Sequence, residues 1–295
     1  MSIPLFKRSR KTNLVYLNEL KKYVLPWWLV PQNIVNRNDG ILAVPANATR
    51  NCMMTPDQNG PFEGMYLTCD LFGGDMTVRI NDAGFTRDLM NRDVLVSTIM
   101  TPAPGGQNVF ILPETLWLEQ RHSLLFTFTD QSGAANSVRP VLHGRKFFLR
   151  QAPAGLGDRF LARRRMQRKV STPYWFTTDQ AVQLANGAAG ARANITIGGE
   201  GHFVAYKITC QSDGPFEFRL IDGETGAALS GSVFVSNTNC TGIGMDPYVF
   251  PEPWFIEKDR LITVEMNNLN ALGANNIWFT MSGRRIYDES YREIV

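Results

Sequence analysis

Several absences narrow what this sequence can encode. No apolar run reaches the roughly 18 residues that a membrane-spanning helix needs. The first residues mix positive charge with polar side chains, so they do not form the apolar region of a signal peptide. The four cysteines contain no Cys-x-x-Cys pair, and the three histidines stand at no metal-ligand spacing. We therefore expect a chain made in the cytosol, without a membrane segment, whose thiols are reduced and mostly buried.

The usual signatures of enzymes are missing as well. The sequence contains no Gly-x-Ser-x-Gly elbow and no phosphate-binding loop. The glycine-rich stretch Gly198–Gly201 stands between two strand-like segments, 193–197 and 203–208, and we expect it to be a hairpin turn. Carboxylate pairs such as Asp88 and Asp93 resemble ordinary surface residues. The sequence therefore predicts no catalytic residue, no cofactor and no metal site.

Charge is scarce and nearly balanced. Charged residues make up 19% of the 295 positions and the net charge is +3, far less basic than is usual for a nucleic-acid-binding domain. The hydrophobic fraction of 44% is close to the average of soluble globular proteins. A chain of this length is suited to two domains of ordinary size, each with its own core.

The sequence consists of two copies of one pattern. Short motifs of the first half return in the same order in the second half, at offsets between 138 and 147 residues. They are Pro26-Trp27-Trp28 with Pro173-Tyr174-Trp175, Leu67-Thr68-Cys69 with Ile208-Thr209-Cys210, Val78–Asp82 with Phe218–Asp222, Pro113–Glu119 with Pro251–Glu257, Ala135-Asn136 with Ala274-Asn275, and Gly144–Phe148 with Gly283–Tyr287. Small insertions and deletions in loops make an offset drift in this way, so the chain is a tandem duplication.

The duplication sets the predicted domain boundaries. We predict a basic N-terminal arm at 1–25, repeat 1 at 26–149, a basic linker at 150–172, repeat 2 at 173–288 and a C-terminal tail at 289–295.

Each repeat has the pattern of a β-sandwich. In the segments Met76–Ile80, Leu124–Phe128, Phe216–Leu220 and Leu261–Met266, apolar residues alternate with polar ones, which is typical of half-buried strands. Turn sequences rich in Gly, Asn, Asp and Pro separate these segments. The predicted fold class is therefore all-β, with two tandem antiparallel, jelly-roll-like sandwiches. Short helical basic segments precede the sandwiches, at Asn13–Tyr23 and Leu156–Lys169.

The basic segments allow three interpretations. The linker can dock on an acidic protein neighbour, it can be a solvated connector, or it can contact packaged nucleic acid. No aromatic residues interleave with its arginines, which weakens the nucleic-acid interpretation.

Aromatic residues stand at the start of each repeat and also allow more than one interpretation. They can belong to the sandwich cores and the contact between domains, they can anchor an interface with another subunit, or they can bind carbohydrate. Together with the basic residues they form our set of candidate partner-docking residues. The set is Lys7, Arg8, Arg10, Lys11, Arg159, Arg163, Arg164, Arg165, Arg168, Lys169, Trp27, Trp28, Tyr174 and Trp175.

The repeats resemble a known group of proteins. Repeat 2 begins with Pro173–Phe176, continues through the expected hairpin, and reaches Phe218–Asp222. Repeat 1 ends with the turn Ser132–Asn136 and the strand Val141–Phe147, and other members of the group end in a strand of similar pattern, with a glycine followed by a lysine between apolar residues. The resemblance is to β-sandwich structural proteins of tailed-bacteriophage virions, encoded among the head and neck genes. It covers roughly residues 26–148 and 173–287, and repeat 2 departs from it at Ser282-Gly283.

This resemblance implies a virion component without enzymatic activity, assembled after synthesis in the host cytoplasm. Such proteins line or decorate the capsid, or form a collar at the portal and tail junction, and they assemble into symmetric homo-oligomers. The expected partners are portal, capsid or tail components, with no membrane contact. The alternative is a carbohydrate- or receptor-binding module of a tail fibre or spike, marked by exposed aromatics in a polar groove. A glycosidase on a jelly-roll scaffold is a third hypothesis and would need two facing carboxylates.

Overall fold

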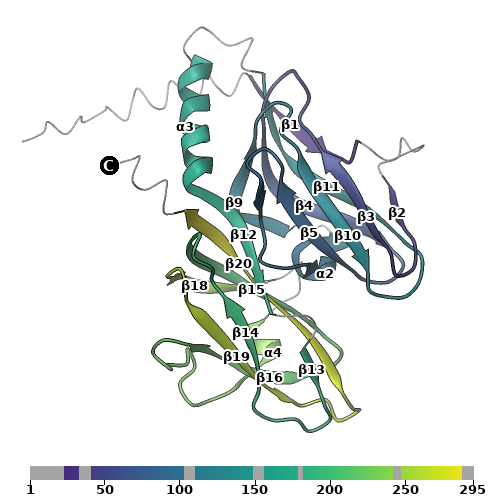
Figure 1. The fold of residues 1–295 in the computed structure, drawn as a ribbon, viewed down its shortest axis with the longest axis vertical. Helices are drawn as coiled ribbons and strands as arrows, with labels where there is room; N and C mark the ends of the chain where they lie inside the picture. Colours follow the sequence, from purple (N-terminus) through teal and green to yellow (C-terminus); the bar gives the residue numbers. More distant parts are fainter. Residues whose placement is uncertain are drawn as a thin grey trace, which may run out of the picture.

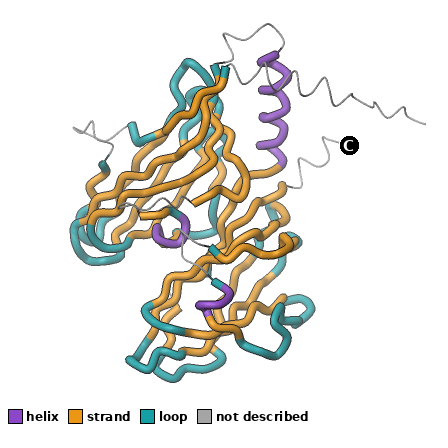
Figure 2. Tube along the Cα trace, turned by 180° about the vertical axis from the view of Figure 1, so that it is seen from behind, coloured by secondary structure: helices purple, strands orange, loops and turns teal. Residues whose placement is uncertain are grey.

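The computed structural model describes residues 23–32, 41–102, 110–148, 156–178, 182–241 and 247–287. Its described part is almost entirely β-sheet, as Figure 2 shows, and α3 is the one long helix in it. Repeat 1 stands above repeat 2 in Figure 1, with α3 connecting them. No helix in these ranges is long and apolar enough to cross a membrane.

Repeat 1 folds into two sheets. Its elements are β1 (Val24–Leu29), β2 (Leu42–Val44), β3 (Thr49–Met54), β4 (Phe62–Phe72), β5 (Met76–Asp82), β6 (Arg87–Asp88), β7 (Val94–Leu95), α2 (Val96–Ile99), β8 (Thr101–Pro102), β9 (Phe110–Leu118), β10 (Leu124–Asp130) and β11 (Asn136–Phe147). One sheet has the order β1-β11-β4-β8, with β2 beside β11 and β9 beside β4. The other has the order β3-β10-β5-β6, with β7 beside β5. All pairings are antiparallel except the short one between β4 and β8.

Repeat 2 has the same arrangement. After α3 (Leu156–Val170) come β12 (Ser171–Thr177), β13 (Val182–Leu184), β14 (Ala191–Thr196), β15 (Gly201–Ser212), β16 (Phe216–Asp222), β17 (Val235–Ser236), α4 (Asn237–Cys240), β18 (Tyr248–Ile256), β19 (Leu261–Asn268) and β20 (Asn275–Tyr287). The sheets are β12-β20-β15-β18, with β13 beside β20, and β14-β19-β16-β17. Each strand occupies the place of its sequence counterpart in repeat 1. The all-β tandem-sandwich prediction is therefore confirmed.

The predicted alternation creates the cores. Met76, Val78 and Ile80 of β5 are buried against the facing sheet, while the residues between them line the outer face. The helix predicted at Leu156–Lys169 is present as α3, whereas the one predicted at Asn13–Tyr23 lies outside the described residues, apart from Tyr23.

The prediction of a hairpin around Gly198–Gly201 is wrong. Strand β14 pairs with β19, and β15 pairs with β18 and β20, so the turn carries the chain from one sheet to the other. Ile195 and Phe203, on either side of the turn, are both buried in the same core. In a hairpin the two strands would lie side by side in one sheet. The prediction failed because strands that face each other across a core show the same alternation of apolar and polar residues.

The glycine in the last strand of each repeat is required by close packing. Gly144 of β11 lies over the main chain of β4, where a Cβ atom would be 1.9 Å from the Glu63 carbonyl oxygen. At Gly283 of β20 the corresponding distance, to the Val204 oxygen, is 2.1 Å. In both repeats the strand pairing shifts register beside this glycine, which is a β-bulge.

In each repeat, the basic residue two positions after this glycine is buried beneath an aromatic side chain. The Lys146 Nζ lies 4.4 Å from the ring centroid of Trp27 and pairs with Asp57. In repeat 2 the Arg285 guanidinium lies 4.8 Å from the Tyr174 ring and pairs with Glu200 at 3.1 Å. An equivalent cation–π contact thus joins the first and last strands of each repeat. It explains why the aromatic motif at the start of the repeat and the basic motif at its end both recur.

Replacing Gly144 by alanine is expected to destabilise the protein by roughly 1–3 kcal/mol, because the added methyl group has no space against the β4 main chain. Gly198→Ala is the matched control, since its Cβ would meet only the Arg285 guanidinium, at 3.5 Å. Chemical unfolding of the variants measures the difference. Equal unfolding midpoints for Gly144→Ala and the control would contradict the packing argument.

Candidate functional site

The basic linker helix is bound to repeat 1 by its own arginines. Along α3, the Arg164 Nη2 lies 2.7 Å from a carboxylate oxygen of Glu63, which is buried. Arg165 donates to Glu119 at 2.6 Å. One turn further, Arg168 pairs with Asp82, and both side chains are buried. Much of the positive charge of the linker is therefore compensated within the chain.

The pair formed by Arg168 and Asp82 is the most deeply buried of these contacts. The Arg168 guanidinium also stacks 4.8 Å above the Phe85 ring. Burial lowers the pKa of Arg168 from its ordinary value, and the Asp82 carboxylate acts in the opposite direction. A buried ion that loses its partner is strongly destabilising, so this pair fixes the end of α3 on repeat 1.

The contact between the repeats is a strand pairing with a shared core. The segment Leu89–Asn91 of repeat 1 runs parallel to β12: the Trp175 N–H donates to the Leu89 carbonyl at 3.0 Å, and the Asn91 N–H donates to the Trp175 carbonyl at 3.2 Å. The Asn91 side chain also bonds both main-chain groups of Thr177. The Trp175 side chain is 1% exposed and belongs to the core of repeat 1. Every residue of β12 is buried.

The corresponding strand of repeat 1 is exposed. Within the described residues, β1 pairs with β11 alone and forms the edge of its sheet. Trp27 packs on Phe148 and on the Lys146 ammonium group. Trp28, the counterpart of Trp175, is 61% exposed. An aromatic residue this exposed on a strand edge is characteristic of an interaction surface.

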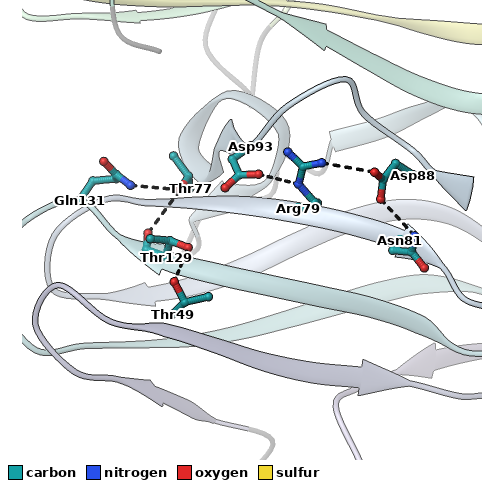
Figure 3. Close-up of polar contacts among 8 residues, drawn as sticks. All are labelled: Thr49, Thr77, Arg79, Asn81, Asp88, Asp93, Thr129 and Gln131. Carbon is teal, nitrogen blue, oxygen red and sulfur yellow. Dashed lines mark hydrogen bonds and ion pairs between the residues drawn. The ribbon is translucent and has the colours of Figure 1, made fainter. Parts of the chain in front are cut away.

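A polar cleft lies between the two repeats. It has a volume of about 670 Å³ and is lined by Thr77, Arg79, Arg92, Asp93 and Gln131 of repeat 1 and by Gln183, Asn276 and Trp278 of repeat 2. Its repeat 1 wall includes the outer face of β5, where side chains form two separate sets of contacts, one around Thr77 and one around Arg79, drawn in Figure 3. Arg79 is central: it donates to Asp93 at 2.6 Å and to Asp88 at 3.3 Å.

The repeats differ at this wall. Arg219 is the counterpart of Arg79, but it pairs with Glu265 at 3.0 Å and lies 4.8 Å from the Phe234 ring. An aromatic residue therefore stands in repeat 2 near the place that Asp93 occupies in repeat 1. The pairing of this arginine with both an Asp88-like and an Asp93-like carboxylate therefore occurs in repeat 1 and not in the described part of repeat 2.

The predicted docking residues fall into different environments. Arg164, Arg165 and Arg168 face repeat 1, whereas Arg163 and Lys169 are exposed on α3, to which Arg159 also belongs. Tyr174 and Trp175 are buried, and Trp27 and Trp28 are exposed. Lys7, Arg8, Arg10 and Lys11 lie outside the described residues.

Sequence reasoning missed the acidic partners and the cleft. Asp82 and Glu119 stand in motifs that recur between the repeats, so their recurrence was visible, but their pairing with α3 depends on the tertiary fold. Arg79 also recurs, as Arg219, but the recurrence does not show that it lines a cleft, and the outward-facing Trp278 carries no pattern beyond ordinary strand alternation.

All four cysteines are described and are free thiols, three of them buried, which confirms the prediction. Burial raises the pKa of Cys52 to about 12, so this thiol stays protonated and unreactive near neutral pH. In the described ranges, no three His, Cys, Asp or Glu side chains converge to form a metal site.

The fold defines a tandem β-sandwich protein whose two repeats contact each other through β12. No protein-family model and no curated protein matches the sequence. Among solved structures, the chain is distantly similar to the PBSX exported protein XepA, with 10% identity over 88% of this chain and 86% of that one and a TM-score of 0.21. A protein of Sulfolobus Turreted Icosahedral Virus shares 12% identity over 86% and 61%, with a TM-score of 0.24. PNGF-II shares 8% identity over 92% and 68%, with a TM-score of 0.30.

Replacing Arg168 by methionine is expected to cost about 3–5 kcal/mol of stability, because Asp82 is left buried without a counter-ion. The double variant Arg168→Met with Asp82→Leu is expected to recover most of this loss. Arg163→Met is the control on the exposed side of α3 and is expected to change stability by less than about 0.5 kcal/mol. Thermal and chemical unfolding give the values. An unchanged stability of Arg168→Met would show that the pair does not fix the helix.

Proposed function

We propose that this chain is a non-enzymatic structural component of a bacteriophage virion. It forms or decorates the neck or collar at the portal and tail junction, or the capsid, by symmetric self-assembly and by docking on neighbouring virion proteins. The observation that carries the proposal is the contact between the repeats, in which Trp175 of one sandwich is buried in the core of the other. The strand pairing and the shared core join two similar sandwiches into one unit. A protein that serves as a building block of an assembly needs such a fixed unit.

Three further features support this function. Trp28 and its neighbours on β1 present an aromatic strand edge, which suits contact with another subunit. Arg163 is exposed on α3 and can meet an acidic neighbour. The sequence motif that resembles phage head and neck proteins also has a structural role here, since Gly144 and Lys146 hold the last strand of the sandwich in place.

Co-sedimentation with purified portal, capsid and tail assemblies tests the proposal. We expect saturable capture at a fixed ratio by one of them. Arg163→Glu is expected to weaken this capture, with the largest effect at low salt, because the exposed arginine no longer meets an acidic surface. Arg50→Glu makes the same charge change on β3 and serves as the control. A chain that none of the three assemblies captures is not a component of this kind.

A carbohydrate- or receptor-binding module is the second candidate, and the cleft between the repeats favours it. The half-buried Trp278 stands there among the amides of Gln131, Gln183 and Asn276 and the charged pair of Arg79 and Asp93. An aromatic surface beside amide and charged groups is the combination that positions a sugar ring.

Titration with host surface glycans, followed by tryptophan fluorescence, tests this second candidate. Binding in the cleft is expected to be lost in Trp278→Ala and kept in Trp28→Ala, because Trp28 lies on β1 outside the cleft. Equal affinity of the two variants would place any glycan site elsewhere, and no binding by the unmodified protein would remove this candidate.

A further inference from the structure

The turn between β13 and β14 in repeat 2 contains the pair Asn186-Gly187. An asparagine that precedes a glycine can lose its side-chain amide without an enzyme. Solvent hydroxide takes the proton of the glycine N–H, the main-chain nitrogen attacks the side-chain carbonyl carbon, and ammonia leaves, which closes a succinimide ring. Water then opens the ring to aspartate or isoaspartate. Glycine favours the attack because it has no Cβ atom to hinder it.

The turn has the same form as its counterpart in repeat 1. Turns Pro45–Ala48 and Ala185–Ala188 are each closed by a hydrogen bond from the fourth N–H to the first carbonyl, of 3.1 Å and 3.0 Å. The third residue has a positive φ in both, 54° for Asn47 and 69° for Gly187. Repeat 1 therefore makes this turn without a glycine, and only repeat 2 has an asparagine before a glycine there.

The main-chain N–H at the third turn position is held in repeat 1 and not in repeat 2. The Asn47 N–H donates to the Asp130 carboxylate at 2.8 Å. The counterpart of Asp130 is Asn268, whose side-chain Nδ2 donates to the Ala185 carbonyl at 2.9 Å. An amide nitrogen donates and cannot accept, so Asn268 does not replace the carboxylate as an acceptor. Among the described residues, the nitrogen of Gly187 that would attack is held by no hydrogen bond.

The side chain that would be attacked is also free to move. Asn186 is exposed, and its amide has no hydrogen bond to any residue that the structure describes. The space around Gly187 is open, since a Cβ atom there would meet nothing within 4 Å. The side chain can therefore rotate until its carbonyl carbon reaches the Gly187 nitrogen, and water has access to the ring that forms.

The second Asn-Gly pair of the sequence, Asn59-Gly60, is held by the fold. Gly60 is buried, and a Cβ atom on it would be 1.9 Å from the Phe147 carbonyl oxygen. On its two sides, the Asn59 N–H donates to Asp57 at 2.8 Å and the Pro61 carbonyl accepts from the Phe147 N–H at 3.0 Å. The main chain cannot adjust here unless this end of the sandwich opens, so the same reaction requires local unfolding.

We propose that Asn186 is a site of spontaneous deamidation in the folded protein, whereas the packing of Gly60 protects Asn59. The reaction consumes one water and releases one ammonia, and it replaces a neutral amide by a carboxylate that is ionised at neutral pH. The isoaspartate product also adds a methylene group to the main chain, in a turn that passes from one sheet of repeat 2 to the other. This modification does not depend on the proposed function.

Incubation of the folded protein in mildly alkaline buffer, followed by peptide mapping with mass spectrometry, tests the proposal. The peptide with Asn186 is expected to convert to aspartate and isoaspartate at least about tenfold faster than the peptide with Asn59, because Asn59 reacts only from a locally opened state. In protein unfolded with urea, the two asparagines are expected to convert at similar rates. That comparison separates the effect of the fold from the effect of the sequence.

Two glycine variants complete the test. Gly187→Asn introduces the residue that repeat 1 has at this position, where Asn47 shows that the turn accepts it, and is expected to abolish most of the conversion of Asn186. Gly226→Asn makes the same change at another open glycine, with a φ of 68°, and is expected to leave the conversion unchanged. An intact Asn186 in the folded protein, equal rates at Asn186 and Asn59 before unfolding, or an unchanged rate in Gly187→Asn would each overturn the proposal.

Discussion

The burial of Trp175 in the core of repeat 1 is the contact on which the arrangement of the molecule depends. A tryptophan side chain is large enough that its removal from water dominates the energetics of a small interface. Here it is delivered by a strand whose main chain also pairs with Leu89 and Asn91, so the apolar and hydrogen-bonded parts of the contact form together. The linker helix supports this arrangement, because Arg164 and Arg168 hold α3 against repeat 1 immediately before β12 begins.

Much of the fold could be predicted because the sequence pattern reflects which residues are buried. Alternation in segments such as Met76–Ile80 identifies which residues face a core, and recurrence of Gly144 as Gly283 marks a place where only glycine fits. Alternation does not say which strand lies beside which. The turn at Gly198–Gly201 was therefore misassigned as a hairpin, although it crosses between sheets.

The surfaces were harder to predict than the fold. The linker arginines and the aromatic residues at the start of each repeat were identified as residues that make contacts, and the sequence left open whether those contacts lie within the chain. Trp28 and Trp175 stand at equivalent places in the two motifs, yet one is exposed and the other is buried. Their difference lies in their tertiary contacts: β12 packs against Leu89–Asn91 of repeat 1, whereas within the described residues β1 pairs with β11 alone. No local pattern records that difference.

The covalent connection through α3 has a consequence for how an assembly of this chain would come apart. The contact between repeats 1 and 2 is intramolecular, so it forms at an effective concentration that does not change when the protein is diluted. A contact between two chains is subject to mass action and weakens on dilution. Dilution would therefore separate one chain from the next and leave the two repeats of each chain joined, so the smallest piece that it releases would always be a pair of sandwiches.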